Sequence, residues 1–257
     1  MWRPFDPDCD WLTHVAIAHR GLHDVGNGIE ENSLPSFEAA IRHGYAIELD
    51  VQLSGDGEAM VFHDHSLDRL TNETGSIHDR PADELNAIGY TNGTGAIPTL
   101  AQVLDLVAGR VGLVVEVKSR WTGDTRLVQR TAHCLSAYGG NVAVMSFDPV
   151  QVAWLAHEAP KIMRGVVADG ATQDDYPWLP LATRLSLRQF RHADVTRPDF
   201  LSLDKHWLPC PVSRRYRKNR TPMICWTVRS EQEASDALRW CDQITFEGYS
   251  PKALTRQ

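Results

Sequence analysis

The sequence of 257 residues predicts an α/β fold, a single (β/α)8 (TIM) barrel. Apolar segments of strand length recur along the chain, and most are separated by segments with the apolar spacing of amphipathic helices. Eight such alternations are typical of a closed parallel barrel, for which this chain length is ordinary. The predicted strands begin near residues 14, 46, 112, 142, 162, 200, 223 and 243. No low-complexity tract or flexible linker divides the chain, so we expect one domain over residues 1–257.

The most informative segment is residues 45–64, YAIELDVQLSGDGEAMVFHD. Polar and apolar residues alternate strictly over residues 47–53, which predicts a β-strand with two different faces. Glu48 and Asp50 lie on the polar face, and the apolar segments on either side indicate that both carboxylates are enclosed. Buried charge is costly unless a cation or hydrogen bonds compensate it. Because His63 ends the next apolar run, the segment indicates a metal site with an acid or base beside it.

The same alternation, taken alone, is also typical of an edge strand with one face in water. A second segment decides between the two interpretations. Residues 112–119, GLVVEVKS, again place polar side chains on one face of a strand, here Glu116 and Lys118. Because two neighbouring strands carry the same pattern, we favour an enclosed polar site over two solvent-exposed faces.

The segments between the strands read as helices, with one exception. Capping residues mark several helix starts: Ser33, Thr99 with Gln102, Asp148 with Pro149, and Ser230 with Glu233. Residues 65–97 are instead polar and rich in turn residues, with room for one short helix near Asp83. We therefore predict a small insertion after the second strand.

Composition limits the classes of protein and of partner. The formal net charge of -7 argues against nucleic acid as a partner. The five cysteines are scattered and show no paired spacing, which favours a reducing compartment over a disulfide framework. No signal-peptide core and no run of membrane-spanning length occurs. We expect a cytoplasmic protein that acts on a small molecule, and the sequence allows a homo-oligomer without specifying one.

Barrel enzymes place their active sites at the carboxyl ends of the strands. In this chain that rule brings together His19, Glu48, Asp50, His63 and the Glu116 strand. Three carboxylates form a hard oxygen set that suits Mg²⁺ or Ca²⁺ better than zinc. Two histidines beside them can divide proton removal from proton delivery. Arg20 and Lys118 have the charge needed to hold a phosphate.

A long ordered series of short motifs resembles the glycerophosphodiester phosphodiesterases. The resemblance is clear over residues 15–120 and looser beyond them. The motifs are IAHRG (17–21), EENS (30–33), SFEAAIRHG (36–44), IELDVQLSGDG (47–57), VFHDHSLDRLT (61–71), IPTL (97–100) and VVEVKS (114–119), followed by MSF (145–147), ICWTV (224–228) and ITFEG (244–248).

The resemblance implies a barrel with an insertion after strand two, and it assigns roles to eight residues. It implies one divalent cation, Mg²⁺ or Ca²⁺, on Glu48, Asp50 and Glu116. It implies His19 and His63 as the acid/base pair, Arg20 and Lys118 on the phosphate, and Trp226 beside the glycerol. The implied reaction begins when one histidine deprotonates the glycerol 2-hydroxyl, which attacks phosphorus, while the other protonates the departing alcohol. Water then opens the cyclic phosphate to give sn-glycerol 3-phosphate.

Several interpretations stay open at this point. Lys118 could instead form a buried structural bridge to Glu116 or Asp50, and Trp226 could be a core aromatic. Glu247 stands where the family tends to have aspartate, and the basic run 214–220 reads as a solvated helix face or a membrane patch. The alternative functions are a lysophospholipase D-type phosphodiesterase and a phosphodiester-binding barrel without catalysis.

Overall fold

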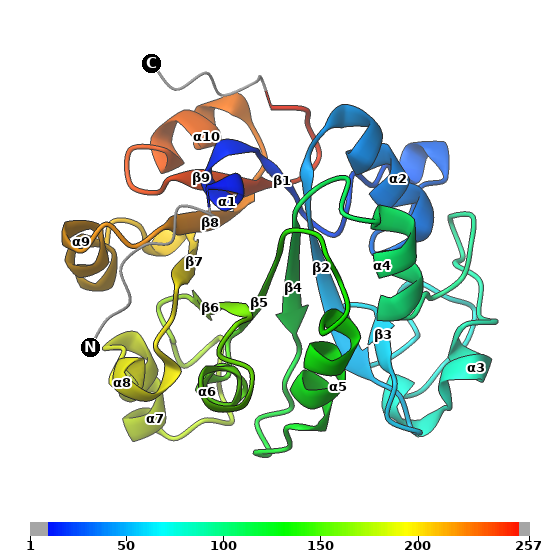
Figure 1. Cartoon of the computed structure of the whole chain (residues 1–257), viewed down its shortest axis with the longest axis horizontal. Coiled ribbons are helices and arrows are strands. Elements are labelled where there is room, and N and C mark those ends of the chain that lie inside the picture. Colours follow the sequence, from blue (N-terminus) through cyan, green and yellow to red (C-terminus); the bar gives the residue numbers. More distant parts are fainter. Residues whose placement is uncertain (1–9, 252–257) are drawn as a thin grey trace. The chain divides into compact units, whose positions relative to one another are not determined.

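The computed structural model describes residues 10–251 (Figure 1). Strands and helices alternate along this part of the chain in the order of a (β/α)8 barrel. The strands are β1 (Ile17–Ala18), β2 (Ala46–Leu53), β3 (Ala59–Val61), β4 (Leu113–Val117), β5 (Val142–Ser146), β6 (Met163–Ala168), β7 (Phe200–Asp204), β8 (Met223–Val228) and β9 (Gln243–Phe246). The helices are α1 (Trp11–His14), α2 (Leu34–His43), α3 (Ala82–Leu85), α4 (Leu100–Val107), α5 (Arg126–Leu135), α6 (Pro149–Glu158), α7 (Leu181–Arg188), α8 (Ala193–Thr196), α9 (Pro211–Lys218) and α10 (Glu231–Ala237).

The predicted fold class is confirmed. Strands β2 and β4–β9 each begin within one residue of the predicted start. The first strand was predicted wrongly at its beginning, because His14 ends helix α1 and β1 does not begin until Ile17. A run as short as HVAIA does not distinguish the end of a helix from the beginning of a strand.

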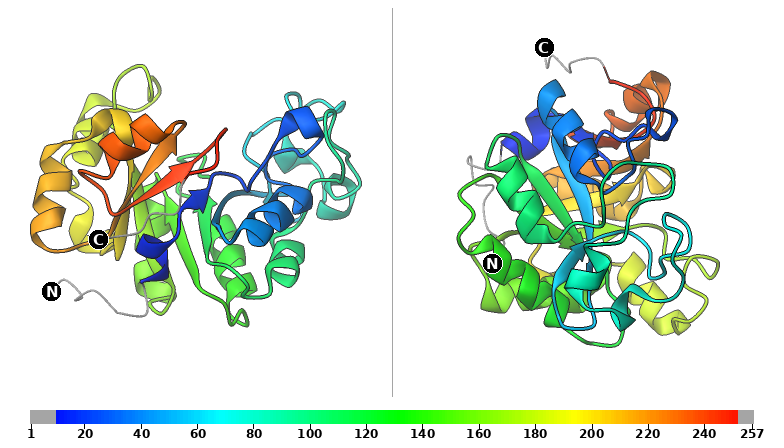
Figure 2. Two further views of the ribbon diagram at one scale, coloured as in Figure 1. Left: turned by 90° about the horizontal axis from the view of Figure 1, so that it is seen from above. Right: turned by 90° about the vertical axis from the view of Figure 1, so that its right-hand side faces the viewer.

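Residues 17–144 form one compact unit, and residues 145–251 together with residues 10–16 form another. In the first unit β2 is central: it pairs in parallel with β1 and β4 and antiparallel with β3. Helices α2, α4 and α5 pack against these strands (Figure 2). In the second unit β6, β7, β8 and β9 pair in parallel in sequence order.

The helix boundaries follow the capping residues. Ser33 and Ser36 form a reciprocal capping box at the start of α2, and Gly44 ends the helix in the left-handed conformation, with φ 72°. Thr99 and Gln102 form the same kind of box before α4. Because these caps satisfy backbone groups that the helices leave unpaired, the sequence alone locates both boundaries.

The polar region 65–97 contains short helices, η3 (Ile77–Asp79) and α3, but it is not without a core. It encloses its own cluster of buried apolar residues, which joins the strand β3 side of the unit. The cluster consists of Met60, Phe62, Leu67, Leu70, Ile77, Leu85, Ile88, Tyr90 and Ile97. The region is therefore a packed substructure on β3 and not a loose excursion.

Two expectations about the whole chain can be compared with the described residues. Cys134, Cys210, Cys225 and Cys241 are free, and Cys9 lies outside the described residues. Between residues 10 and 251, no helix has the length and apolar character needed to cross a bilayer.

Candidate active site

Three buried carboxylates meet on neighbouring strands of the first unit. Glu48 and Asp50 belong to β2, and Glu116 belongs to β4, where it is the register partner of Asp50. Their exposed fractions are 2%, 1% and 6%. One oxygen from each carboxylate lies within 4.8 Å of the others, a group that could hold a metal ion. The alternation seen in the sequence therefore creates an acidic cluster in the interior, because the whole of β2 is buried.

Two cations contact this cluster. Lys118 Nζ lies 2.9 Å from Asp50 Oδ1 and 2.6 Å from Glu116 Oε1. Arg20 Nε lies 3.3 Å from Asp50 Oδ2, yet this buried nitrogen makes no hydrogen bond to any residue between 10 and 251. Although burial opposes it, the attraction of Lys118 and other nearby cations holds the pKa of Asp50 well below its ordinary range. In this structure Lys118 thus occupies the bridging position of the alternative interpretation.

The pKa values of Glu48 and Glu116 are raised, in contrast to that of Asp50. Burial, together with repulsion from Asp50 and Glu116, raises the pKa of Glu48 well above its ordinary value. Burial also raises the pKa of Glu116, even though Lys118 opposes it. The protein alone therefore does not compensate three negative charges here. A divalent cation is the kind of group that would, and three carboxylate oxygens suit Mg²⁺ or Ca²⁺.

The two predicted histidines lie beside the cluster. His19 directly follows β1, and its Nε2 lies 4.0 Å from Glu48 Oε2. The next residue, Arg20, donates its backbone N–H to the same oxygen at 3.0 Å and has a left-handed backbone with φ 56°. A non-glycine residue seldom adopts this conformation, and here it turns the chain so that backbone and side chain both face the carboxylates.

His63 follows β3 and is held on two sides. Gln52 Nε2 of β2 donates to the His63 carbonyl at 2.8 Å. The His63 Nδ1 atom lies 2.6 Å from Asp64 Oδ1. With Nδ1 engaged by the carboxylate, the Nε2 atom is the one left for a ligand.

Four further residues complete the site, and the residue-by-residue interpretation of the sequence gave none of them a role. Asn32 pairs with Asp50 twice: Asn32 Nδ2 donates to Oδ2 at 2.9 Å, and the Asp50 N–H donates to Asn32 Oδ1 at 3.2 Å. Arg69 donates to Asp64 Oδ2 at 2.6 Å and to Glu31 Oε1 at 2.8 Å. Glu31 Oε1 also accepts from Arg20 at 2.8 Å.

These bonds form a continuous path from His63 through Asp64, Arg69 and Glu31 to Arg20. Its members stand in the motifs IAHRG, EENS and VFHDHSLDRLT, so the sequence does contain them. Their pairing could not be predicted, because Arg69 and Glu31 are 38 residues apart and no local spacing joins them.

The remaining predicted residues belong to the unit that contains residues 145–251. Trp226 of β8 packs edge-on against Phe147, with ring centroids 5.5 Å apart, and its buried Nε1 has no hydrogen-bond partner among the described residues. Glu247 forms an ion pair with Arg229, with Arg229 Nη2 3.3 Å from Glu247 Oε2. Most of the basic run 214–220 lies in α9.

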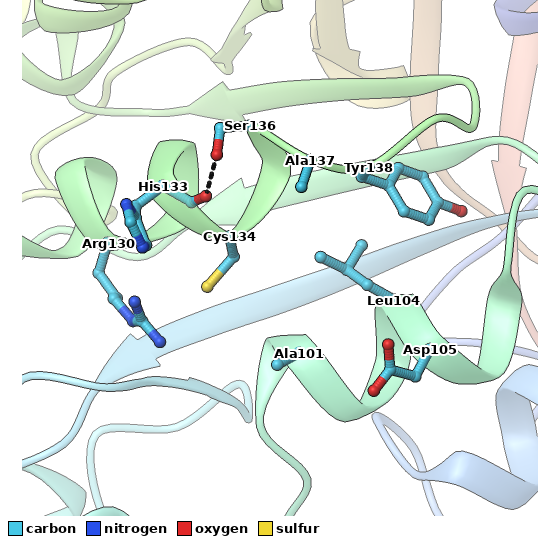
Figure 3. Close-up of a pocket in the computed structure, with 9 residues that line it drawn as sticks. All are labelled: Ala101, Leu104, Asp105, Arg130, His133, Cys134, Ser136, Ala137 and Tyr138. Atoms are coloured by element: carbon cyan, nitrogen blue, oxygen red, sulfur yellow. Dashed lines mark hydrogen bonds between the residues drawn. The ribbon is translucent and has the colours of Figure 1, made fainter.

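A separate surface pocket of about 360 Å³ lies between α4 and α5 (Figure 3). It contains none of the predicted site residues. Two of its polar groups already have partners: Arg130 pairs with Glu58 at 2.7 Å, and the Tyr138 hydroxyl accepts from the Gly109 N–H at 3.0 Å. We assign no ligand to it.

Residues 19–248 match the family model described as the glycerophosphoryl diester phosphodiesterase family. The chain belongs to this family. A glycerophosphodiester phosphodiesterase from Caldanaerobacter subterraneus is 31% identical over 235 residues, which cover 88% of this chain and 90% of the relative. Another, from Bacillus altitudinis, is 40% identical over 109 residues, which cover 40% of this chain and 43% of the relative. The family and the enzyme class predicted from the sequence are confirmed.

Solved structures agree on the fold. A phosphodiesterase from Oleispira antarctica, in complex with the product sn-glycerol-3-phosphate, superposes with a TM-score of 0.73 at 22% identity, covering 90% of this chain and 91% of that one. A glycerophosphodiester phosphodiesterase from Thermotoga maritima gives a TM-score of 0.69 at 24% identity, covering 91% and 94%. At these identities the likeness is evidence for the barrel alone.

Proposed function

We propose that this protein hydrolyses small glycerophosphodiesters to an alcohol and sn-glycerol 3-phosphate, with a divalent cation at the acidic cluster. The observation that carries the proposal is the cluster itself: three buried carboxylates, with one oxygen of each within 4.8 Å of the others, and His19 Nε2 4.0 Å from Glu48 Oε2. Family membership supports the reaction class. We also propose that the 257 residues form one barrel domain, acting in the cytoplasm on a small molecule.

Glu48, Asp50 and Glu116 would hold the cation. Their fit rests on geometry and donor chemistry, since three buried carboxylates each place an oxygen within 4.8 Å of the others. The raised pKa values of Glu48 and Glu116, caused first by burial, support the same assignment. Both Mg²⁺ and Ca²⁺ meet the requirement for hard oxygen ligands. When bound, the cation would neutralise charge that develops on the phosphoryl oxygens.

His19 and His63 would move the protons. One histidine accepts the proton of the glycerol 2-hydroxyl as that oxygen bonds to phosphorus. The other donates a proton to the oxygen of the departing alcohol as the bond between that oxygen and phosphorus breaks. Water then adds to the cyclic phosphate, whose opening regenerates the 2-hydroxyl. Asp64 would hold the His63 ring through Nδ1, so that Nε2 faces the substrate.

Arg20 and Lys118 would bind the phosphate. Arg20 Nε is buried and, within the described part of the chain, makes no hydrogen bond, so it can still donate to an additional oxygen. Lys118 Nζ already contacts Asp50 and Glu116, and its positive charge would lower the cost of placing a phosphate beside them. Trp226, whose Nε1–H has no hydrogen-bond partner among residues 10–251, would bind the substrate.

The test is release of glycerol 3-phosphate from glycerophosphocholine, glycerophosphoethanolamine and glycerophosphoglycerol. We expect product with Mg²⁺ or Ca²⁺, none with chelator, and none from His19→Ala. Product that persists in chelator would refute the metal role. Turnover of lysophospholipids in place of these diesters would favour the lysophospholipase D alternative. Metal binding without any product would favour a binding barrel.

A further inference from the structure

Helix α7 and the segment before it expose three large apolar side chains. Trp178, Leu181 and Leu185 are 62%, 61% and 41% exposed. None of the eight residues of α7 is buried. A surface helix of a globular protein normally turns its apolar stripe toward the core, so a helix that turns large apolar residues to solvent needs a partner to explain it.

The orientation of α7 is set by its opposite side. Leu187 lines a small, partly open pocket together with Tyr176 and Val166, and the Tyr176 hydroxyl donates to Asp169 Oδ2 at 3.0 Å. Leu181 and Leu185 are one helical turn apart, so they share a face, and Leu187 lies on another. The outward apolar face is therefore a fixed feature of the fold, because the segment is anchored through its other side.

Arginines accompany this apolar face. Residues 176–193 contain Arg184, Arg188 and Arg191 and no acid, although the chain as a whole has a formal charge of -7. None of the three pairs with a carboxylate among the described residues 10–251. Arg184 and Arg188 are one helical turn apart and adjoin the leucine stripe. We call Trp178, Leu181, Leu185 and these three arginines the α7 surface.

We propose that the α7 surface binds reversibly to an anionic phospholipid bilayer. Trp178, Leu181 and Leu185 would enter the head-group region, and the arginines would contact lipid phosphates. Leucine and tryptophan beside a basic flank are the composition of helices that lie in this interface. The long aliphatic stems of arginine allow the charge to remain at the phosphate level while the apolar residues are buried.

A second copy of the chain fits the same surface poorly. In a two-fold dimer each patch meets itself, so Arg184, Arg188 and Arg191 would face the same three arginines of the other copy. An anionic bilayer supplies the opposite charge. Asp174 and Asp175 precede the surface and Asp194 follows it, so we expect weak, salt-sensitive attachment and not permanent anchoring.

The test is cosedimentation of the whole protein with vesicles of phosphatidylcholine alone, or of phosphatidylcholine with phosphatidylglycerol. We expect binding to the mixed vesicles at low salt, and loss of binding as salt rises. The double variant Leu181→Ser/Leu185→Ser should bind at least about tenfold more weakly because buried apolar area is removed. Each arginine changed to glutamine should weaken binding about fivefold.

Matched controls come from the same unit. Val150→Ser removes another exposed apolar residue, 45% exposed in α6, and Arg239→Gln removes another exposed arginine, here one paired with Asp236. Neither should change vesicle binding. In addition, brominated lipid should quench tryptophan fluorescence in the wild type and much less in Trp178→Phe, a variant that needs no change in α7.

Three results would overturn the proposal. The first is no binding of the wild type to mixed vesicles at low salt, and the second is equal weakening by the control substitutions. The third is a solution dimer that Leu181→Ser/Leu185→Ser dissociates, which would make the surface an interface between copies. Circular dichroism of each variant verifies folding, and the quenching and arginine variants test the proposal if the leucine variant does not fold. Since every readout is binding, the outcome is independent of the proposed hydrolysis.

Discussion

Residues 17–144 and residues 145–251 use their polar groups in different ways. In the first region the acids and bases of β2, β4 and the adjoining loops converge on one buried cluster, and each is connected to the next. In the second region the ion pairs are scattered: Arg164 with Asp199, Lys205 with Glu233, and Arg229 with Glu247.

The two regions share the alternation of strands and helices but differ in how their charged side chains are arranged. Convergent buried charge costs folding free energy and is retained where it performs chemistry. Exposed pairs such as Arg229 with Glu247 cost and contribute little, whereas Arg164, which pairs with Asp199, is buried. We therefore expect substitutions in the first region to change turnover, and substitutions in the second to change substrate binding, membrane attachment or stability. The predictions below test that division, in order of their effect on turnover.

The largest effect is expected at His63. His63→Ala should lower kcat by at least about a hundredfold, because it removes a proton-transfer group. Unfolding temperature should change little, since the ring is partly exposed. Steady-state kinetics and thermal unfolding measure the two quantities. His157→Ala, in the second region and 79% exposed, is the matched control. A variant of His63 that keeps more than about a hundredth of the wild-type kcat would remove it from the mechanism.

A smaller effect is expected at Asp64, which lies 2.6 Å from His63 Nδ1. Asp64→Asn should lower kcat on the order of tenfold to a hundredfold with KM nearly unchanged, because the His63 ring loses its orienting partner. The decisive comparison is the effect of Asp64→Asn on kcat in the wild-type protein and in the His63→Ala protein. Asp64→Asn should have almost no further effect in the His63→Ala protein. If it lowers kcat equally in both backgrounds, Asp64 acts through the structure and not through His63.

Arg69 lies one step further along the path. Arg69→Gln removes hydrogen bonds to both Asp64 and Glu31, and it should lower kcat by less than Asp64→Asn. The control is Arg80→Gln, which removes the same positive charge from the same region. Arg80 pairs with Glu73 and Glu84. An Arg69 effect no larger than that of Arg80→Gln would show that the path beyond Asp64 does not position His63.

The sequence predicted the fold class and the acidic cluster because both depend on local periodicity. Alternation over residues 47–53 places Glu48 and Asp50 on one face regardless of tertiary contacts. The two parallel partners of β2 then follow from the order of the strands. The path through Arg69 and Glu31 could not be predicted in this way, since it depends on how the region 65–97 folds over β3. The start of β1 was missed because five residues carry too little periodicity.

Trp226 is expected to have a small effect. Trp226→Phe keeps the ring packed near Phe147 and removes the unpaired Nε1–H. If this N–H donates to the substrate, KM should rise severalfold, roughly 3- to 10-fold, with kcat little changed. Steady-state kinetics on a soluble glycerophosphodiester measures both constants. An unchanged KM would instead support the interpretation of Trp226 as a core aromatic.

The smallest effect on turnover is expected at His192, which should influence stability alone. Burial, with a smaller contribution from Arg215, lowers the pKa of His192 from its ordinary 6.5 to about 4. The folded protein therefore keeps this ring neutral where the unfolded chain protonates it. As pH falls from 6.5 toward 4 the unfolded state gains protons and stability decreases, by up to about 3 kcal/mol from this group. Above pH 6.5 the group contributes no pH dependence.

His192→Gln removes the titrating ring and keeps a polar side chain. Urea unfolding at pH 7 and at pH 4.5 should show a smaller loss of stability in the variant than in the wild type, while kcat at neutral pH stays the same. His133→Gln, an exposed histidine in the first region, should leave the acid sensitivity as it is. Equal acid sensitivity in wild type and His192→Gln would place the acid-labile group elsewhere. Glu31 would then be a group to examine. Burial opposes it, but Arg69 and Arg20 hold the pKa of Glu31 below its ordinary 4.5, and the resulting stability begins to be lost as pH falls toward that value.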